Sequence, residues 1–326
     1  MTIDAQILTT LRGVGEGSVS GADLAQRLGV SRAAIWARIE ELRTLGYDIE
    51  ASPHRGYRLL GAPDLLHADD LVARLGRTRV IGREIQVFEE TTSTNDVIEK
   101  LAQAGVQEGA VVFAESQTKG RGRLGRRWIS PPHKGLWFSV LLRPKMRPQA
   151  VTQLTIATAA AVARAIYRET GVATAIKWPN DILVGRKKLV GILTELNAEL
   201  DTVKYVIIGI GVDVNLNVSE LPPELRSVAT SLKIEAGAAF DRAALAAAIL
   251  RELDEDYARL LRGDFKAVAD DWVERCTTIG NNVTIHIGDR RVSGRAESLD
   301  EDGALLLRTE HGRLERIIGG DVTVEK

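Results

Sequence analysis

The chain has 326 residues, of which 44% are hydrophobic and 27% are charged, and its formal net charge is −1. This length predicts two or three domains that can each bury a core, and this composition excludes a disordered or membrane-embedded protein. The single cysteine, Cys276, excludes an internal disulfide and a multi-cysteine metal site. The first residues lack the basic start and apolar run of a signal peptide, so we expect a cytoplasmic protein without a membrane partner.

Residues 1–61 have the pattern of three short helices followed by a β-hairpin. Ser20 and Ser31 stand where N-caps of the second and third helices are expected, and Gly46 is placed to end the third. Two short strands, 47–51 and 56–60, follow around a turn. This order predicts a winged helix-turn-helix, whose third helix can lie in the major groove of DNA.

The predicted DNA-binding unit carries no excess of positive charge. Its seven arginines are balanced by seven acidic residues, although phosphate neutralisation supplies much of the affinity of a DNA-binding protein. We therefore expect salt-sensitive binding that depends on a dimer. Trp36 fits either the core or the surface that faces the groove. The candidate DNA contacts are Ser31, Arg32, Arg38 and Arg55.

A linker at residues 61–64 leads into a longer region with both strands and helices. Strands are predicted at 111–114, 136–142, 176–178, 191–196 and 205–214, and helices at 151–167 and 242–261. From residue 283 the hydrophobic period becomes two, which predicts a small β-barrel of five short strands. The predicted fold is therefore mixed α/β (α+β), with domains at residues 1–61, 62–275 and 276–326.

The segment of residues 117–134, called the basic loop below, contains six Lys or Arg residues and no Asp or Glu. Glycines in such a loop let backbone N–H groups approach phosphate oxygens, and arginines bind them through paired hydrogen bonds. The basic loop therefore predicts an anion site, and the alternative is a solvated surface loop. Gly120 to Gly125 also matches the dinucleotide motif GxGxxG, but Pro131 and Pro132 prevent the helix which that motif requires.

Four motifs together resemble the bacterial bifunctional biotin protein ligases, which are also biotin operon repressors. They are TSTN at residues 92–95, QTKGRGRLGRRW at 117–128, KWPND at 177–181 with RKKLVG at 186–191, and GIG at 209–211. The resemblance covers nearly the whole chain. It implies a central domain like those of class II synthetases, an SH3-like C-terminal barrel and a two-step reaction that uses biotin, ATP and Mg²⁺.

The resemblance also implies roles for individual side chains. Lys188 would hold the biotin carboxylate and the phosphate together, and Asp181 would orient or deprotonate the incoming lysine. The implied catalytic residues are Lys188, Arg121, Arg123 and Asp181. The implied biotin-binding residues are Ser93, Thr94, Asn95, Gln117, Arg121, Gly122, Arg123, Lys188 and Gly191. The implied nucleotide-binding residues are Arg123, Arg126, Trp128, Trp178, Asn180 and Asn215, and no permanent protein site for a metal is expected.

Several alternatives stay open at this point. Residues 93–95 also fit an ordinary helix cap, and Trp178 also fits a buried structural role. Asp213 stands where the family often has Asn, so its contacts with ribose or metal are undecided, and Asn215 is a possible substitute. A lipoate or octanoate ligase, a regulator that only senses biotin, and a ligase with a silent DNA-binding domain are the competing functions.

The resemblance leads to further expectations about partners and motion. The expected partners are a biotin carboxyl carrier protein, operator DNA and a second copy of the chain that associates when the adenylate forms. We also expect residues 120–127 to be disordered without ligand and to become ordered over the adenylate, because mutually repelling cations gain a counter-charge only then.

Overall fold

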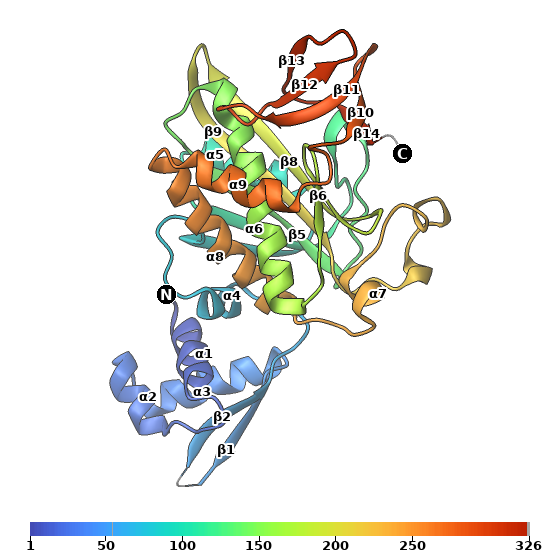
Figure 1. Cartoon of the computed structure of the whole chain (residues 1–326). Coiled ribbons are helices and arrows are strands. Elements are labelled where there is room, and N and C mark those ends of the chain that lie inside the picture. The colour runs from blue at the N-terminus through green and yellow to red at the C-terminus, as the bar shows by residue number, and fades with distance from the viewer. Residues whose placement is uncertain (54, 325–326) are drawn as a thin grey trace.

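The computed structural model describes residues 1–53 and 55–324. Figure 1 shows three parts: a small helical domain at the bottom, a large mixed α/β domain in the middle and a small β domain at the top. The N-terminus lies where the small helical domain meets the large domain.

The N-terminal domain contains three helices and a two-stranded hairpin, as predicted. They are α1 (Ile3–Gly13), α2 (Gly21–Leu28), α3 (Arg32–Thr44), β1 (Asp48–Ser52) and β2 (Gly56–Gly61). The Ser20 hydroxyl accepts a hydrogen bond from the Asp23 N–H (3.0 Å), and the Ser31 hydroxyl accepts one from Ala34 (3.1 Å). Both predicted caps are therefore confirmed. Trp36 on α3 is 60% exposed, so it belongs to the surface.

The central domain is built on a seven-stranded sheet with the strand order β3-β4-β5-β9-β8-β7-β6. Its strands are β3 (Glu84–Thr91), β4 (Ala110–Gln117), β5 (Gly135–Leu142), β6 (Ala175–Lys177), β7 (Asp181–Val184), β8 (Lys187–Glu199) and β9 (Thr202–Asp213). The pair β3–β4 is parallel, and the other neighbouring pairs are antiparallel. Strands β3 and β7 were not predicted, because β3 is rich in acidic residues and β7 has only four residues.

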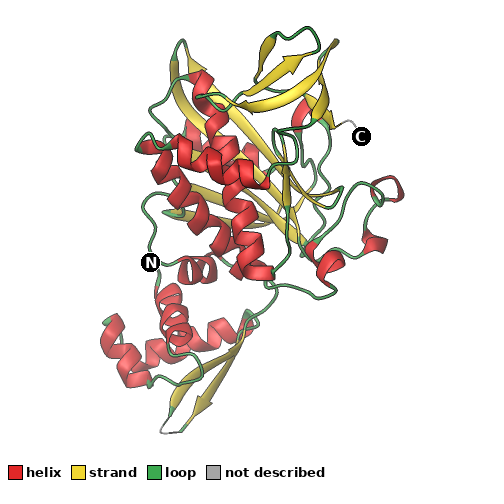
Figure 2. Cartoon of the chain, in the orientation of Figure 1, coloured by secondary structure: helices red, strands yellow, loops and turns green. Residues whose placement is uncertain are grey.

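Helices cover both faces of this sheet. In Figure 2, α6 (Thr152–Thr170), α8 (Arg242–Leu261) and α9 (Phe265–Arg275) lie in front of the sheet. Helix α5 (Thr94–Gln103) packs on the opposite face. Alternate residues of β4 point to opposite faces of the sheet, so Phe113 belongs to the hydrophobic cluster with α6 and α8, and Val112 to the cluster with α5. Short helices α4 (Ala68–Leu75) and α7 (Leu232–Ala236) complete the domain.

The segment Pro148–Thr170, which includes α6, is long and apolar enough to cross a membrane by length and composition alone. In the structure, however, 72% of its most apolar window is buried inside the protein. Arg164, in the middle of α6, forms ion pairs with Glu252 and Asp256 of α8 and with Asp271 of α9. This segment is therefore a core helix of the central domain.

The C-terminal domain is an antiparallel sheet of five strands, as predicted, with the order β13-β12-β11-β10-β14. The strands are β10 (Asn282–Ile287), β11 (Arg290–Leu299), β12 (Leu305–Thr309), β13 (Leu314–Ile317) and β14 (Asp321–Val324). Its buried apolar residues belong to the same hydrophobic cluster as those of the central domain, whereas the N-terminal domain has a core of its own. Cys276 precedes this sheet; burial raises the pKa of its thiol.

Candidate active site and DNA-binding surface

A cavity of about 560 Å³ opens between the large sheet, the basic loop and the C-terminal domain. Its lining comes from the start of α5, from β8 and β9, from the basic loop and from β14. Every residue that the sequence analysis assigned to biotin, nucleotide or catalysis lines this cavity, with the exception of Asn215. The tertiary structure therefore brings together motifs that lie more than a hundred residues apart in the sequence.

Neutral hydrogen-bonding groups gather at one end of the cavity. The Gln117 amide oxygen accepts a hydrogen bond from the Thr94 N–H (2.8 Å), and its NH₂ group donates to the Ser130 hydroxyl (2.8 Å). Ser139, which the sequence analysis missed, donates to the Thr94 hydroxyl at 2.7 Å. Ser93 occupies the N-cap position of α5, but its hydroxyl makes no capping hydrogen bond. That hydroxyl, in a residue that lines the cavity, can instead bind a ligand.

Trp128 lies against two glycines on neighbouring strands. A Cβ atom on Gly211 would lie 2.5 Å from Nε1 of Trp128, and one on Gly191 would lie 2.7 Å from Cζ3 of the same ring. Gly191 and Gly211 face each other across β8 and β9. A Cβ on Gly209 would lie 2.4 Å from Oδ1 of Asn95. The glycines of these motifs are thus needed because an indole and an amide pack directly on the backbone of the sheet.

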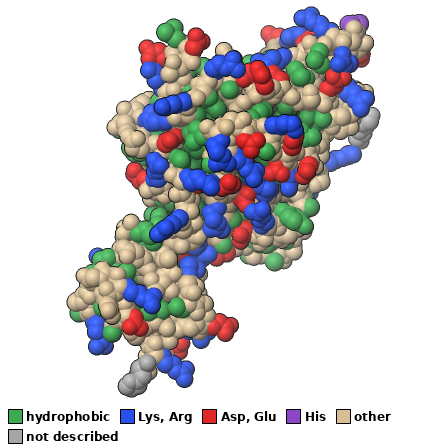
Figure 3. Space-filling view, turned by 60° about the vertical axis from the view of Figure 1, so that its left-hand side comes forward, with side chains coloured by type: hydrophobic (Ala, Val, Ile, Leu, Met, Phe, Trp, Pro, Cys, Tyr) green, Lys and Arg blue, Asp and Glu red, His purple; other side chains and the backbone are tan. Residues whose placement is uncertain are grey.

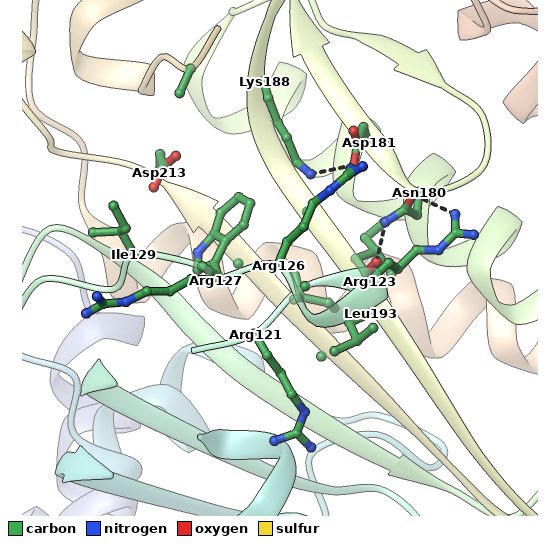
Figure 4. Close-up of a pocket in the computed structure, with 18 of the residues that line it drawn as sticks. Arg121, Arg123, Arg126, Arg127, Ile129, Asn180, Asp181, Lys188, Leu193 and Asp213 are labelled. Atoms are coloured by element: carbon green, nitrogen blue, oxygen red, sulfur yellow. Dashed lines mark hydrogen bonds and ion pairs between the residues drawn. The ribbon is translucent and has the colours of Figure 1, made fainter. Parts of the chain in front are cut away.

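Acidic side chains bind Arg121 at the same end of the cavity, next to Asn95. Its guanidinium binds Glu195 of β8 (3.0 and 3.2 Å) and also forms a close ion pair with Asp96 of α5. Asn95 donates to the same Glu195 carboxylate at 2.5 Å. In Figure 4, Arg121 points away from the region where Lys188 and Asp181 meet. Arg121 is therefore paired with two carboxylates, and Glu195 is a neighbour of the site that the sequence analysis missed.

Lys188 and Asp181 form the central charged pair of the cavity. The Lys188 Nζ lies 2.6 Å from Asp181 Oδ1 and 5.3 Å from the centre of the Trp128 ring. Lys187, the preceding residue of β8, does not line the cavity. Asp213 also lines the cavity and is 6% exposed, and its carboxylate has no hydrogen-bond partner among residues 1–53 and 55–324. Burial raises the pKa of Asp213 well above its usual range, and the charge of Lys188 opposes this only in part.

The basic loop contacts both the central and the C-terminal domain. Arg123 donates a hydrogen bond to Asn180 Oδ1 (3.2 Å), and burial lowers the pKa of its guanidinium. Arg126 forms a close ion pair with Asp321 at the start of β14. Backbone hydrogen bonds within the loop include Gly122 N–H to the Arg126 carbonyl (2.7 Å). The C-terminal domain therefore supplies part of the cavity wall, which motif analysis did not anticipate.

Two of the residues assigned to nucleotide binding have roles in the core. Trp178 is 1% exposed and packs in the main hydrophobic cluster, although it also borders the cavity. Asn215 does not line the cavity, and its amide group exchanges two hydrogen bonds with the backbone of Phe240 (2.9 and 3.0 Å). Asp213 stands where the family often has Asn, and Asn215 was the possible substitute for that Asn. This expectation is not supported, because the Asn215 amide is already used to hold Phe240.

The candidate DNA contacts of the helix-turn-helix are all exposed, but their arginines differ in whether their charge is compensated. Arg38 is bound to Glu41 of its own helix (2.7 Å) and lies 3.8 Å from Asp4, so its charge is largely compensated. Arg32 and Arg55 are exposed and form no ion pair within residues 1–53 and 55–324. In Figure 3 the small lobe shows only scattered Lys and Arg side chains, whereas the large domain carries a dense band of them. Arg38 is the weakest of the expected DNA contacts.

Comparisons with known protein families agree with this division of the chain. Residues 5–58 match an HTH domain, residues 87–213 match the biotin/lipoate A/B protein ligase family, and residues 278–324 match the biotin protein ligase C-terminal domain. These three matches, in this order, are those of a protein ligase with an attached DNA-binding domain.

Individual relatives match over almost the whole chain. A bifunctional ligase/repressor BirA of Bacillus subtilis is 38% identical over 98% of each chain, and that of Escherichia coli is 30% identical over 94% of this chain and 92% of its own. The structure of biotin protein ligase from Aquifex aeolicus in complex with biotin and ATP is similar with a TM-score of 0.64 and 30% identity. It covers 75% of this chain and 99% of the Aquifex chain. The chain belongs to the family of bifunctional ligase/repressor proteins.

Proposed function

We propose that the chain is an ATP-dependent biotin protein ligase, which forms biotinyl-5′-AMP and then transfers biotin to a lysine of a biotin carboxyl carrier protein. One observation carries this proposal: a single cavity joins a neutral hydrogen-bonding end, a central lysine and a cationic loop. Hydroxyl and amide groups suit the uncharged ureido ring of biotin, and cations suit the phosphates of ATP.

In the first step, a carboxylate oxygen of biotin attacks the α-phosphorus of ATP. The new P–O bond forms as the bond to the leaving pyrophosphate breaks, so negative charge accumulates where two anions meet. Lys188, in the middle of the cavity, can contact both groups and hold them in line. Its partner Asp181 keeps the ammonium group in place before the substrates arrive.

The basic loop would supply the remaining positive charge. Arg123 and Arg126 line the cavity, and Arg121 closes its biotin end through Glu195 and Asp96. We expect Arg126 to exchange Asp321 for a phosphate when ATP binds, because a phosphate offers more charge at the same distance. The ordering of residues 120–127 over the adenylate stays a prediction, and closure would shield the mixed anhydride from water.

In the second step, the carrier's lysine amine attacks the biotinyl carbonyl carbon. The C–N bond forms as the bond to the phosphate oxygen breaks, and AMP leaves with both electrons of that bond. Asp181 lies at the cavity and can accept the proton that the amine loses. Mg²⁺ enters as the metal of the co-substrate ATP; residues 1–53 and 55–324 contain no cluster of three or more His, Cys, Asp or Glu side chains suited to a metal.

A lipoate or octanoate ligase is the competing enzyme, and the observations favour it less. A fatty acid needs an apolar channel, whereas this cavity places Ser93, Thr94 and Gln117 at the end opposite the nucleotide side. Two relatives that match over most of their own length, from Mycobacterium tuberculosis and Paracoccus denitrificans, are named biotin–[acetyl-CoA-carboxylase] ligases.

The decisive assay mixes purified protein with biotin, Mg²⁺ and ATP labelled at the α-phosphate. We expect labelled biotinyl-AMP and pyrophosphate, and no product when lipoate replaces biotin. Lys188→Ala is expected to lose most of this activity while Lys187→Ala keeps it, since only Lys188 lines the cavity. Equal activity of the two variants would contradict the role of Lys188.

We also propose that the N-terminal domain binds operator DNA and represses transcription in response to biotin. The three helices and the exposed surface of α3 around Arg32 and Trp36 support this role. A homodimer that forms on adenylate binding would add a second weak DNA contact, and we place the protein in the cytoplasm. We propose domain boundaries after residues 61 and 275, with α4 as the first helix of the central domain.

A further inference from the structure

A chain of ion pairs crosses the boundary between the N-terminal domain and the central domain. Arg12 of α1 donates to Asp70 of α4 at 2.6 Å, and Arg74 binds the second oxygen of the same carboxylate at 2.8 Å. Arg74 then reaches Asp241, the N-cap residue of α8, at 2.9 Å. The Asp70 side chain is only 3% exposed, so its two arginines compensate a charge that water cannot reach.

The next residue of α8, Arg242, holds the segment that joins the two domains. Its guanidinium donates to the Asp64 carboxylate and to the Asp64 carbonyl, both at 2.8 Å. It also donates to Glu115 of β4 at 2.5 Å and to the carbonyl of Gly135, the first residue of β5, at 3.2 Å. The Leu66 N–H completes this arrangement by donating to Glu115 at 2.6 Å. Arg242 and Glu115 are 1% and 2% exposed, so their pair is shielded from solvent.

The strand ends that Arg242 binds also form the wall of the ligand cavity. Gln117 follows Glu115 by two positions on β4, and Gly135 pairs with Asp213 across β5 and β9. Gln117 and Asp213 both line the cavity. A ligand that shifts these strand ends by a few tenths of an ångström therefore moves two acceptors of Arg242 at once.

We propose that Arg242 and the chain Arg12–Asp70–Arg74–Asp241 are a mechanical link, which couples occupancy of the ligand cavity to the attachment of the DNA-binding domain. Three of its members, Arg12, Arg74 and Arg242, are positioning residues, since none of them lines the cavity. Asp70, Arg242 and Glu115 are buried, so stretching their ion pairs in a low-dielectric environment costs free energy, and a displacement of one partner is passed on to the next. The link rests on the proposed function only for the choice of biotin and ATP as ligands.

Hydrogen–deuterium exchange of the full chain, with and without biotin, Mg²⁺ and ATP, tests this link, and biotinyl-AMP is quantified in the same samples. In the wild type we expect the ligands to change exchange in α5 and also in α1, in α4 and in residues 61–67. In Arg12→Gln, Asp70 keeps Arg74 as its partner, so the fold is expected to persist. The change in α1 should be lost in this variant while that in α5 remains, and Arg12→Lys should restore part of it.

The matched control is Arg27→Gln, which removes the same charge from α2. Arg27 is exposed and forms no ion pair within the described ranges 1–53 and 55–324, so its variant should behave like the wild type. Unchanged exchange in α1 and α4 of wild-type samples that contain biotinyl-AMP would overturn the link and leave the ligase function intact. Equal responses of the Arg12 and Arg27 variants would overturn it too. A sample that forms no biotinyl-AMP would overturn the ligase function, and the coupling with it.

Discussion

The contact between Trp128 and the sheet gives a prediction whose size follows from the structure. In Gly211→Ala the new Cβ would lie 2.5 Å from Nε1 and 2.6 Å from Cε2 of Trp128. Ordinary contacts begin near 3.4 Å, so the indole must move by about 0.9 Å. Overpacking of this kind costs about 1–3 kcal/mol. We therefore expect the free energy of unfolding to fall by about 1–3 kcal/mol in denaturant titrations. We also expect kcat/KM for ATP in biotinyl-AMP formation to fall, because the displaced indole is part of the cavity wall.

A double-mutant cycle separates this clash from other effects of the substitution. In a Trp128→Ala background the steric cost disappears, so Gly211→Ala is expected to lower kcat/KM far less there than in the wild type. Gly61→Ala is the control, because its Cβ meets nothing closer than 3.7 Å and its backbone is not left-handed. If Gly211→Ala were equally harmful with and without the indole, packing against Trp128 would not be the reason for this glycine.

Three further predictions concern single side chains. Burial raises the pKa of Asp213, so its neutral form favours the folded state at low pH, and this contribution is lost as pH rises through the raised pKa. Asp213→Asn should therefore raise the unfolding temperature more at pH 8 than at pH 4. An equal gain at both pH values would contradict this. Asp321→Asn frees Arg126, so trypsin should cut the basic loop faster without ligand, and an unchanged rate would show that the ion pair does not restrain it. Arg32→Ala should lower the slope of log affinity for duplex DNA against log salt concentration by about one unit. Arg38→Ala should change this slope little, because the charge of Arg38 is compensated by Glu41. Equal slopes for both variants would argue against this surface.

Features whose signal is local could be predicted from the sequence. The caps at Ser20 and Ser31 act over three residues, and the cationic glycine pattern of the basic loop is continuous in the chain. Apolar runs located five strands of the large sheet, because strands covered by helices on both faces are apolar throughout. Alternation of apolar residues located the C-terminal sheet, because a strand with one buried face repeats every two residues. Strand β3 escaped this test because it is an edge strand with charged residues along it.

What only the tertiary structure decided is which charged groups meet. The sequence alone determined that Arg121, Arg126 and Lys188 belong to motifs for binding anions. It could not determine that Arg121 is held by Glu195 and Asp96, or that Arg126 reaches Asp321 in another domain. Electrostatic attraction and hydrogen bonding depend on distance in space and on burial, and neither quantity is a function of separation along the chain.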